Sequence, residues 1–374
     1  MAEKTKRRRG RGCLITILAI TGLLVLAIAA SSLSNIGLPQ SQASDRLDPL
    51  DKARTAEALN VKARLGNNLW PEWAASPNPL ILWNRAYEFL LNYPGTPHLA
   101  WEAVPGEAFN GWPYYRKPAA DPQNFAVPIG DVWAASMATK TETDVFLIDT
   151  FHSRFPTPLK QVFPYRLLIQ PSETQIGGVL HEDFHVFEHL AAMDRLAQAE
   201  AAHRYGDQYE AAAESFQAGL KQEAGLLAKA LVTTTDEDVA SYVSQFLLAR
   251  DGRRNSTRLA AELIDYERWL EWEEGMAKYV EVNSYRLASQ TTGYSPLAEM
   301  AADPYFKAYK KFNSRWSQEL FQLRNPSGSS ETRFYNIGMA ESFLLDRLKP
   351  DWKATVMQEG VFLEDLLRQA VQGK

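Results

Sequence analysis

One helix-forming stretch, GGVLHEDFHVFEHL at residues 177–190, constrains this chain more than any other. Three histidines recur in it at four-residue intervals: His181, His185 and His189. On a helix they share one face, flanked by Glu182 and Glu188, while most of the remaining positions are apolar. Such a helix is expected to be buried, and each buried polar group without a partner costs about 1–3 kcal/mol. A bound cation would satisfy several of these groups at once, so the stretch predicts a metal site.

Residues 181–185 read H-E-x-x-H, in which two imidazoles one turn apart bind a single Zn²⁺. The glutamate between them, Glu182, is then the general base that takes a proton from a zinc-bound water. The only cysteine, Cys13, lies near the N-terminus, so a metal site in the rest of the chain must use His, Asp and Glu. We therefore expect His181 and His185 to be zinc ligands.

The third zinc ligand does not follow the metzincin pattern H-E-x-x-H-x-x-G-x-x-H. Position 188 is glutamate instead of glycine, position 191 is alanine, and His189 comes too early. We therefore interpret His189 as a residue that supports the site or lies at the surface. The other histidines stand alone in the sequence and are expected to be structural or exposed: His98, His152 and His203.

A downstream helix, WLEWEEGMAKYVEV at residues 269–282, offers glutamates as the third ligand. Its E-G-x-A segment resembles the gluzincin metallopeptidases, in which the glutamate before the glycine binds zinc. The resemblance implies that Glu274 is the ligand. The small residues Gly275 and Ala277 would let this helix approach the zinc helix closely, and Glu281 would orient a ligand histidine.

Two departures from the gluzincin pattern leave an alternative open. The spacing of 89 positions from His185 to Glu274 is longer than in the thermolysin branch, so we read two predicted helices between them as an insertion. Several of these families also carry an acid four residues after the ligand, where this chain has Lys278. Glu271 shares the helix face and remains the rival ligand.

Gluzincins stabilise the tetrahedral oxyanion with a tyrosine or histidine beside the zinc. The segment RFYNIGMAESFLLDRL, residues 333–348, offers Tyr335 before a small glycine-containing turn of helix. The resemblance implies that the Tyr335 phenol is this donor, since developing negative charge needs a preorganised hydrogen-bond donor. A tyrosine that only packs in the core is the other interpretation.

The N-terminus has the pattern of a membrane signal. Residues 1–12 carry six basic side chains and one acid, and residues 13–30 are uncharged and mostly apolar. About 17–25 such residues cross a bilayer, and the basic flank stays cytoplasmic. We therefore predict a cytoplasmic tail (1–12) and a transmembrane signal-anchor (13–30), with the body outside the cytoplasm at the cell membrane. Cleavage after the segment would instead make the protein secreted.

The rest of the chain predicts an α+β, mainly α fold: a zincin-like catalytic domain behind one transmembrane helix. Residues 31–50 read as a linker, residues 51–176 as an aromatic-rich subdomain with a small mixed sheet, and residues 177–374 as a helical zinc-peptidase subdomain. The best strand candidates are residues 79–94, 144–156 and 164–171.

These features predict a membrane-tethered, outward-facing zinc metallopeptidase, a hydrolase acting on a peptide or protein substrate. The acidic body, with a formal charge of −5 for the whole chain, does not suggest a nucleic-acid partner. The alternative is a non-catalytic, outward-facing interaction protein with a structural or degenerate zinc site. An intact Glu182 favours the enzyme, because a purely structural site has no need of that carboxylate.

Overall fold

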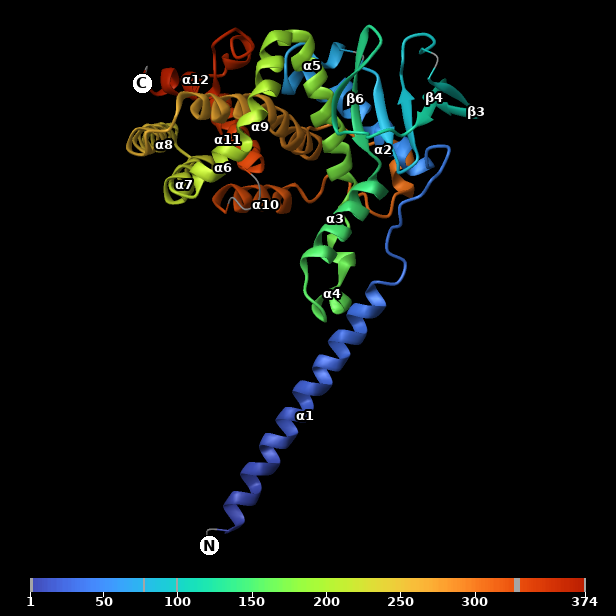
Figure 1. Cartoon of the computed structure of the whole chain (residues 1–374), viewed down its shortest axis with the longest axis vertical. Coiled ribbons are helices and arrows are strands. Elements are labelled where there is room, and N and C mark those ends of the chain that lie inside the picture. Colours follow the sequence, from blue (N-terminus) through green and yellow to red (C-terminus); the bar gives the residue numbers. More distant parts are fainter. Residues whose placement is uncertain (1–2, 77, 99, 326–329, 373–374) are drawn as a thin grey trace.

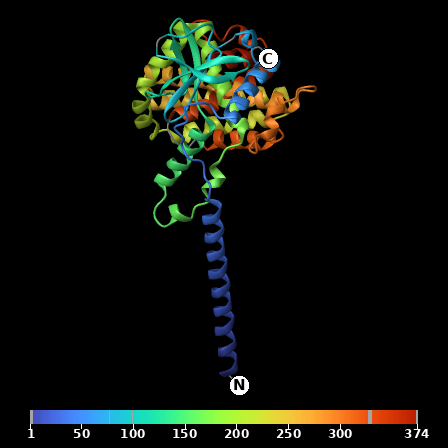
Figure 2. The same ribbon diagram turned by 90° about the vertical axis from the view of Figure 1, so that its right-hand side faces the viewer.

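The computed structural model describes residues 3–76, 78–98, 100–325 and 330–372, and it describes no side chains for residues 3–14, 17 and 330. A helical body and a six-stranded sheet lie side by side, with a long N-terminal helix projecting away from both (Figures 1 and 2). The predicted α+β, mainly helical class with a small mixed sheet is confirmed.

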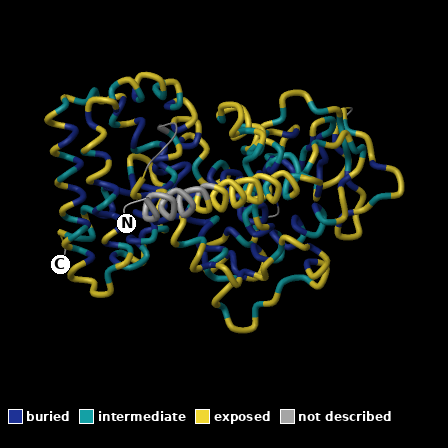
Figure 3. Tube along the Cα trace, turned by 90° about the horizontal axis from the view of Figure 1, so that it is seen from below, coloured by how far each residue is buried: buried dark blue, intermediate teal, exposed yellow. Residues whose placement is uncertain are grey.

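Helix α1, Glu3–Ser34, contains the predicted apolar span. Its large apolar side chains are exposed along its described length, for example Ile15 at 66%, Leu23 at 67% and Leu33 at 66% (Figure 3). Part of the predicted 13–30 span, including Cys13 and Leu14, lies outside the residues whose side chains are described. Among the described residues, no helix combines the length and the apolar character needed to cross a membrane.

The chain then enters the body through α2, Pro49–Leu69. Asp48 begins this helix: its side chain accepts a hydrogen bond from the backbone N–H of Leu50, and Pro49 occupies the first turn, where no intrahelical donor is needed. The sequence favours a short helix over residues 52–66, and α2 covers that range and extends beyond it at both ends.

The six strands that follow α2 in the chain form one mixed sheet. They are β1 Leu80–Trp83, β2 Tyr87–Leu91, β3 Glu102–Phe109, β4 Trp112–Pro118, β5 Phe125–Ile129 and β6 Val132–Ala138. The order is β3-β4-β2-β1-β6-β5; β1 and β6 pair in parallel and all other neighbours are antiparallel. β5 is therefore an edge strand, and α5 packs against β5 and β6.

Two of the three strand predictions are wrong. Residues 79–94 do form β1 and β2, but residues 144–156 belong to α3, Lys140–Arg154. An ion pair one turn apart, Lys140 to Asp144 at 2.5 Å, supports that helix. Residues 164–171 contain only a short 3₁₀ turn, Tyr165–Leu168, because prolines bracket a run too short to pair.

The helical body follows the predicted region closely. Its helices are α5 Ser172–Ala202, α6 Gly206–Ala213, α7 Gln217–Val232, α8 Asp236–Thr257, α9 Ala261–Gln290, α10 Phe312–Arg324, α11 Ser330–Leu348 and α12 Leu363–Gln372. The short helix α4, Leu159–Val162, lies outside this body and contacts α1 (Figure 1). The sequence favours a last helix over residues 352–371, but the chain turns at Gly360, whose φ is +73°, so α12 begins only at Leu363.

Helix α9 is the centre of the body, because it packs on α5 along one side and on α11 along another. Contact with α11 is closest at Gly275 and Gly338, where a Cβ added to Gly338 would lie 2.2 Å from the carbonyl oxygen of Glu271. We had expected Gly275 to face the zinc helix; it faces α11 instead. On the α5 side the close contact is made by Gly177, beside the side chain of Glu281.

Candidate metal centre

Helix α5 carries the H-E-x-x-H residues into the interior. His181 is 6% exposed, Glu182 8% and His185 1%, whereas Leu190, one turn past the motif, is 62% exposed. These side chains are buried because this part of α5 lies between the sheet and α9. The expected buried polar sector therefore exists.

Glu274 reaches this sector from α9. Its Oε2 lies 3.1 Å from His181 Nε2 and 3.5 Å from His185 Nε2, and potential ligand atoms of the three residues all lie within 4.8 Å of one another. The structure thus brings together His181, His185 and Glu274, the three ligands predicted from the sequence, although Glu274 lies 89 positions after His185.

The rival glutamate, Glu271, lies elsewhere. Its two carboxylate oxygens accept hydrogen bonds from Arg250 Nη1 at 2.8 Å and Nη2 at 2.6 Å. A carboxylate held in this bidentate manner is not available to the histidines of α5. Geometry therefore favours Glu274 over Glu271.

Both histidines also have a carboxylate at the other ring nitrogen. His185 Nδ1 lies 2.8 Å from Glu188 Oε2, and His181 Nδ1 lies 3.7 Å from Glu281 Oε2. Glu281 is itself paired with Lys278 at 2.9 Å. Carboxylates in these positions orient metal-binding imidazoles and fix their tautomers. Lys278, the departure from the gluzincin pattern, thus contacts the carboxylate that faces His181.

Glu188 was noted in the sequence only as a flanking acid. Its spacing of three residues after His185 is the signal that predicts the contact, because side chains three apart meet on a helix. His189, by contrast, stacks on Trp133, with ring centroids 3.8 Å apart, and is not among the residues whose potential ligand atoms come together. The expectation that it is not a ligand agrees with this position.

Burial dominates the protonation of the carboxylates. It raises the pKa of Glu182 to about 7, and it raises the pKa of Glu188 to about 7 against the opposing effect of His185. A Glu182 poised near neutrality is able both to accept and to return a proton.

The histidines and Glu274 behave as coupled ion pairs. Burial would lower the pKa of His181, but hydrogen bonds with Glu274 and Glu281 raise it to about 9. Burial would likewise raise the pKa of Glu274, yet the hydrogen bond with His181 and the proximity of His185, 3.5 Å away, bring it well below its usual range. The cluster therefore favours positive charge beside the Glu274 carboxylate.

Tyr335 joins the cluster from α11. Its ring stacks on that of His181, with centroids 5.7 Å apart and planes 8° from parallel. Burial, with the nearby charge of Glu274, raises the pKa of Tyr335 well above its usual value. The phenol therefore keeps its proton and remains a hydrogen-bond donor beside the histidines.

The three residues could hold a metal ion. Zn–N and Zn–O bonds of about 2.0–2.2 Å would place neighbouring tetrahedral ligand atoms about 3.3 Å apart, and the two distances to Glu274 Oε2, 3.1 and 3.5 Å, lie on either side of that value. His185 Nε2 is also buried without a hydrogen-bond partner. A cation among the three residues would give this nitrogen a partner, whereas no hydrogen bond in the described structure does so.

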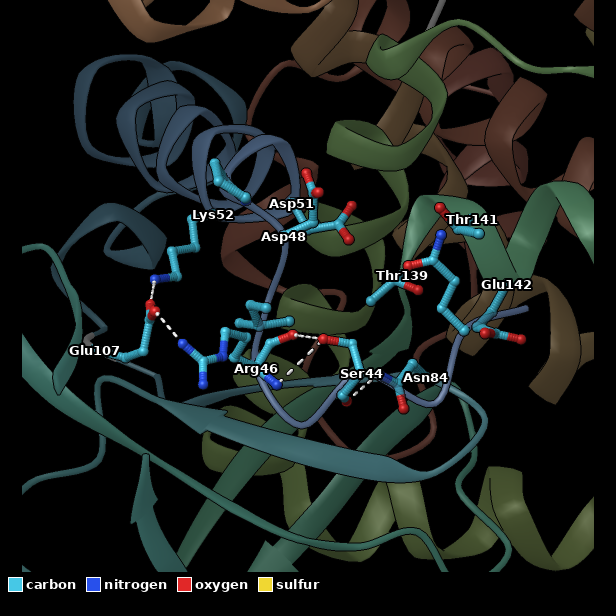
Figure 4. Close-up of a pocket in the computed structure, with 13 residues that line it drawn as sticks. Ser44, Arg46, Asp48, Asp51, Lys52, Asn84, Glu107, Thr139, Thr141 and Glu142 are labelled. Carbon is cyan, nitrogen blue, oxygen red and sulfur yellow. Dashed lines mark hydrogen bonds and ion pairs between the residues drawn. The ribbon is translucent and has the colours of Figure 1, made fainter. Parts of the chain in front are cut away.

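A polar pocket of about 360 Å³ lies apart from this cluster, between the linker, the start of α2 and the sheet (Figure 4). None of the residues of the metal centre lines it. Its two basic side chains, Arg46 and Lys52, are both paired with Glu107. The pocket therefore adds no ligand to the His/Glu cluster.

Comparison with known proteins gives no match to a family model, a curated protein or a solved structure.

Proposed function

We propose that this protein is a zinc metallopeptidase of the gluzincin type. The observation that carries the proposal is the meeting of His181, His185 and Glu274 at spacings suited to zinc, with Glu182 on the same buried helix segment. His181, His185 and Glu274 would hold the ion. Zinc, when bound, supplies a Lewis acid that lowers the pKa of water and stabilises developing negative charge.

The chain's own groups complete the hydrolysis. The carboxylate of Glu182 accepts the proton of the water that attacks the peptide carbonyl carbon, and then returns it to the departing amine nitrogen. The protonated phenol of Tyr335 donates a hydrogen bond to the carbonyl oxygen as it gains negative charge. The products are a carboxylic acid and an amine, so one water is consumed for each bond cleaved.

An extended substrate would pair with β5 and not with residues 164–171, which form only a short 3₁₀ turn. β5 is an edge strand, and the ring of Phe125 lies 4.7 Å from that of His185. A peptide added to this edge would run past the metal centre with its backbone hydrogen bonds satisfied.

The proposal includes a tether to the cell membrane through residues 13–30. Its support is the basic tail in the sequence and the exposed apolar side chains along α1 (Figure 3). Membrane fractionation of the full chain tests it: the protein should sediment with membranes and resist extraction by high salt. Release by salt would contradict the tether without bearing on the peptidase.

The peptidase itself is tested by incubating the full chain with a peptide library. Cleavage should require zinc, stop with a chelator, and fall about 10²–10⁴-fold in Glu182→Gln while zinc content stays unchanged. If the parent binds zinc but cleaves nothing, and Glu182→Gln matches it in every assay, the non-catalytic interaction protein is the better account.

A further inference from the structure

A third histidine lies next to the metal centre, although it had been assigned a structural or exposed place. His203 follows the end of α5, beyond a kink at Ala192 where φ is −153° and ψ is 53°. Its Nε2 lies 3.0 Å from Glu273 Oε2, and its Nδ1 lies 3.2 Å from Glu331 Oε1. The chain that follows α5 therefore places His203 beside Glu273, the neighbour of Glu274 in the sequence.

Glu274 belongs to two groups of ligand atoms. Besides His181 and His185, it lies with His203 and Glu273 in a set whose potential ligand atoms are all within 4.8 Å of one another. Glu273 and Glu274 are neighbours on α9, so their carboxylates are held by the same turn of helix. A carboxylate shared between two such groups is placed as a bridging ligand.

Buried oxygen atoms in this region lack partners. Glu273 is fully buried, and its Oε1 has no hydrogen-bond partner; the same is true of Glu188 Oε1. An unpaired buried carboxylate oxygen is costly, and it is commonly satisfied by a cation. These two unpaired oxygens indicate that this region needs more positive charge than one cation on the first triad supplies.

The charges lead to the same result. Four acids meet here, none of them in an ion pair with a lysine or arginine in the described part of the chain: Glu182, Glu188, Glu273 and Glu274. One dication on the first triad supplies two positive charges for these four carboxylates, and Glu273, which faces His203, lies outside that triad.

We propose that His203, Glu273 and Glu274 hold a second divalent cation, with Glu274 bridging the two ions. The inference rests on the proposed function for its first ion. Imidazole and carboxylate together suit zinc or a related transition metal. Glu331 at His203 Nδ1 then repeats the arrangement of Glu188 at His185 Nδ1, in which a carboxylate orients a ligand imidazole.

The second cation also has a route from solvent. The side chain of His203 is 34% exposed, whereas those of the first triad are 8% exposed or less. Pairs of metal ions about 3.5–4 Å apart act together in binuclear hydrolases such as aminopeptidases. The more open ion would therefore be the one that meets the incoming substrate first.

The test is zinc titration of the full chain after chelator treatment, followed by metal analysis. The parent should bind about two equivalents, and His203→Ala and Glu273→Gln about one each. His152→Ala, which removes an exposed histidine, is the matched control and should keep both. A parent that binds one equivalent, unchanged in His203→Ala, overturns the second site and leaves the first intact. A parent that binds no zinc overturns both proposals.

A spectroscopic measurement on the parent avoids dependence on variants that fail to fold. Loading with two equivalents of Co²⁺ should give magnetically coupled ions, because a shared carboxylate links them. A spectrum of isolated Co²⁺ alone, or two equivalents retained by folded His203→Ala, overturns the bridged pair. His203 would then be an imidazolium held between Glu273 and Glu331.

Discussion

His181 Nε2 and Glu274 Oε2 lie 3.1 Å apart, although 93 residues separate them along the chain. Their contact joins α5 to α9 where two buried histidines and a buried glutamate converge. Because the ligands come from two helices that must pack before the site exists, metal binding and folding of this body are expected to be coupled.

Replacing Glu274 with Gln should remove most of the bound zinc, because the variant loses one of three protein ligands. Glu271→Gln is the matched control, one helical turn away. It should keep zinc in the folded fraction but lose about 3–5 kcal/mol of stability, since it leaves Arg250 without its bidentate partner in the interior. Metal analysis and chemical denaturation measure both effects; zinc loss in Glu271→Gln but not Glu274→Gln would reverse the ligand assignment.

Tyr335→Phe should lower kcat about 10²–10³-fold and leave KM and zinc content nearly unchanged. The variant keeps the ring that stacks on His181 and removes only the donor that the oxyanion needs. Steady-state kinetics on any peptide that the parent cleaves provides the measurement. An unchanged kcat would make Tyr335 a packing residue and leave the oxyanion to the metal alone.

Gly338→Ala should destabilise the body by about 1–3 kcal/mol or more and weaken zinc binding. The new Cβ would meet the carbonyl oxygen of Glu271 at 2.2 Å, so α9 and α11 must separate and shift Glu274. Gly225→Ala on α7 is the control, because its Cβ would meet nothing within 4 Å and alanine favours a helix. Equal thermal stability of the two variants would contradict the tight α9–α11 contact.

Glu341 and Glu364 share Arg250 but should respond oppositely to replacement by Gln. Burial and neighbouring Glu271 raise the pKa of Glu341 well above its usual value, and its Oε2 has no partner. Burial would raise the pKa of Glu364 as well, but Arg250 and Arg254 lower it to about 2. The environment of Glu341 therefore favours its protonated form, whereas Glu364 is a paired carboxylate at neutral pH.

The sign of each pH effect follows from these shifts. The raised pKa of Glu341 gives stability that is lost as pH rises, so Glu341→Gln should match the parent near pH 5 and exceed it near pH 9. The lowered pKa of Glu364 gives stability that is present above about pH 4 and is lost as pH falls toward 2. Glu364→Gln should thus cost about 3–5 kcal/mol at pH 7. Denaturation at pH 5, 7 and 9 distinguishes the two; a Glu341→Gln variant less stable than the parent at pH 9 would contradict the assignment.

Local features could be predicted well from the sequence where a regular spacing of a few residues determines the structure. The four-residue spacing of His181 and His185 fixes both on one helix face whatever the rest of the chain does. Helical composition after residue 177 likewise predicts most of α5 to α9. Strands fared worse: β3 to β6 were not singled out and α3 was read as a strand, because a strand is defined by a partner distant in sequence.

Only the tertiary structure could distinguish the roles of Glu271, Glu273 and Glu274 on α9. Within four residues of helix, Glu271 faces Arg250 of α8, Glu273 faces His203 beyond the end of α5, and Glu274 faces His181 and His185. The sequence by itself determined that carboxylates would lie one turn apart on a buried helix. Which cation each one meets depends on how α5, α8 and α11 pack around α9, and no spacing within α9 encodes that packing.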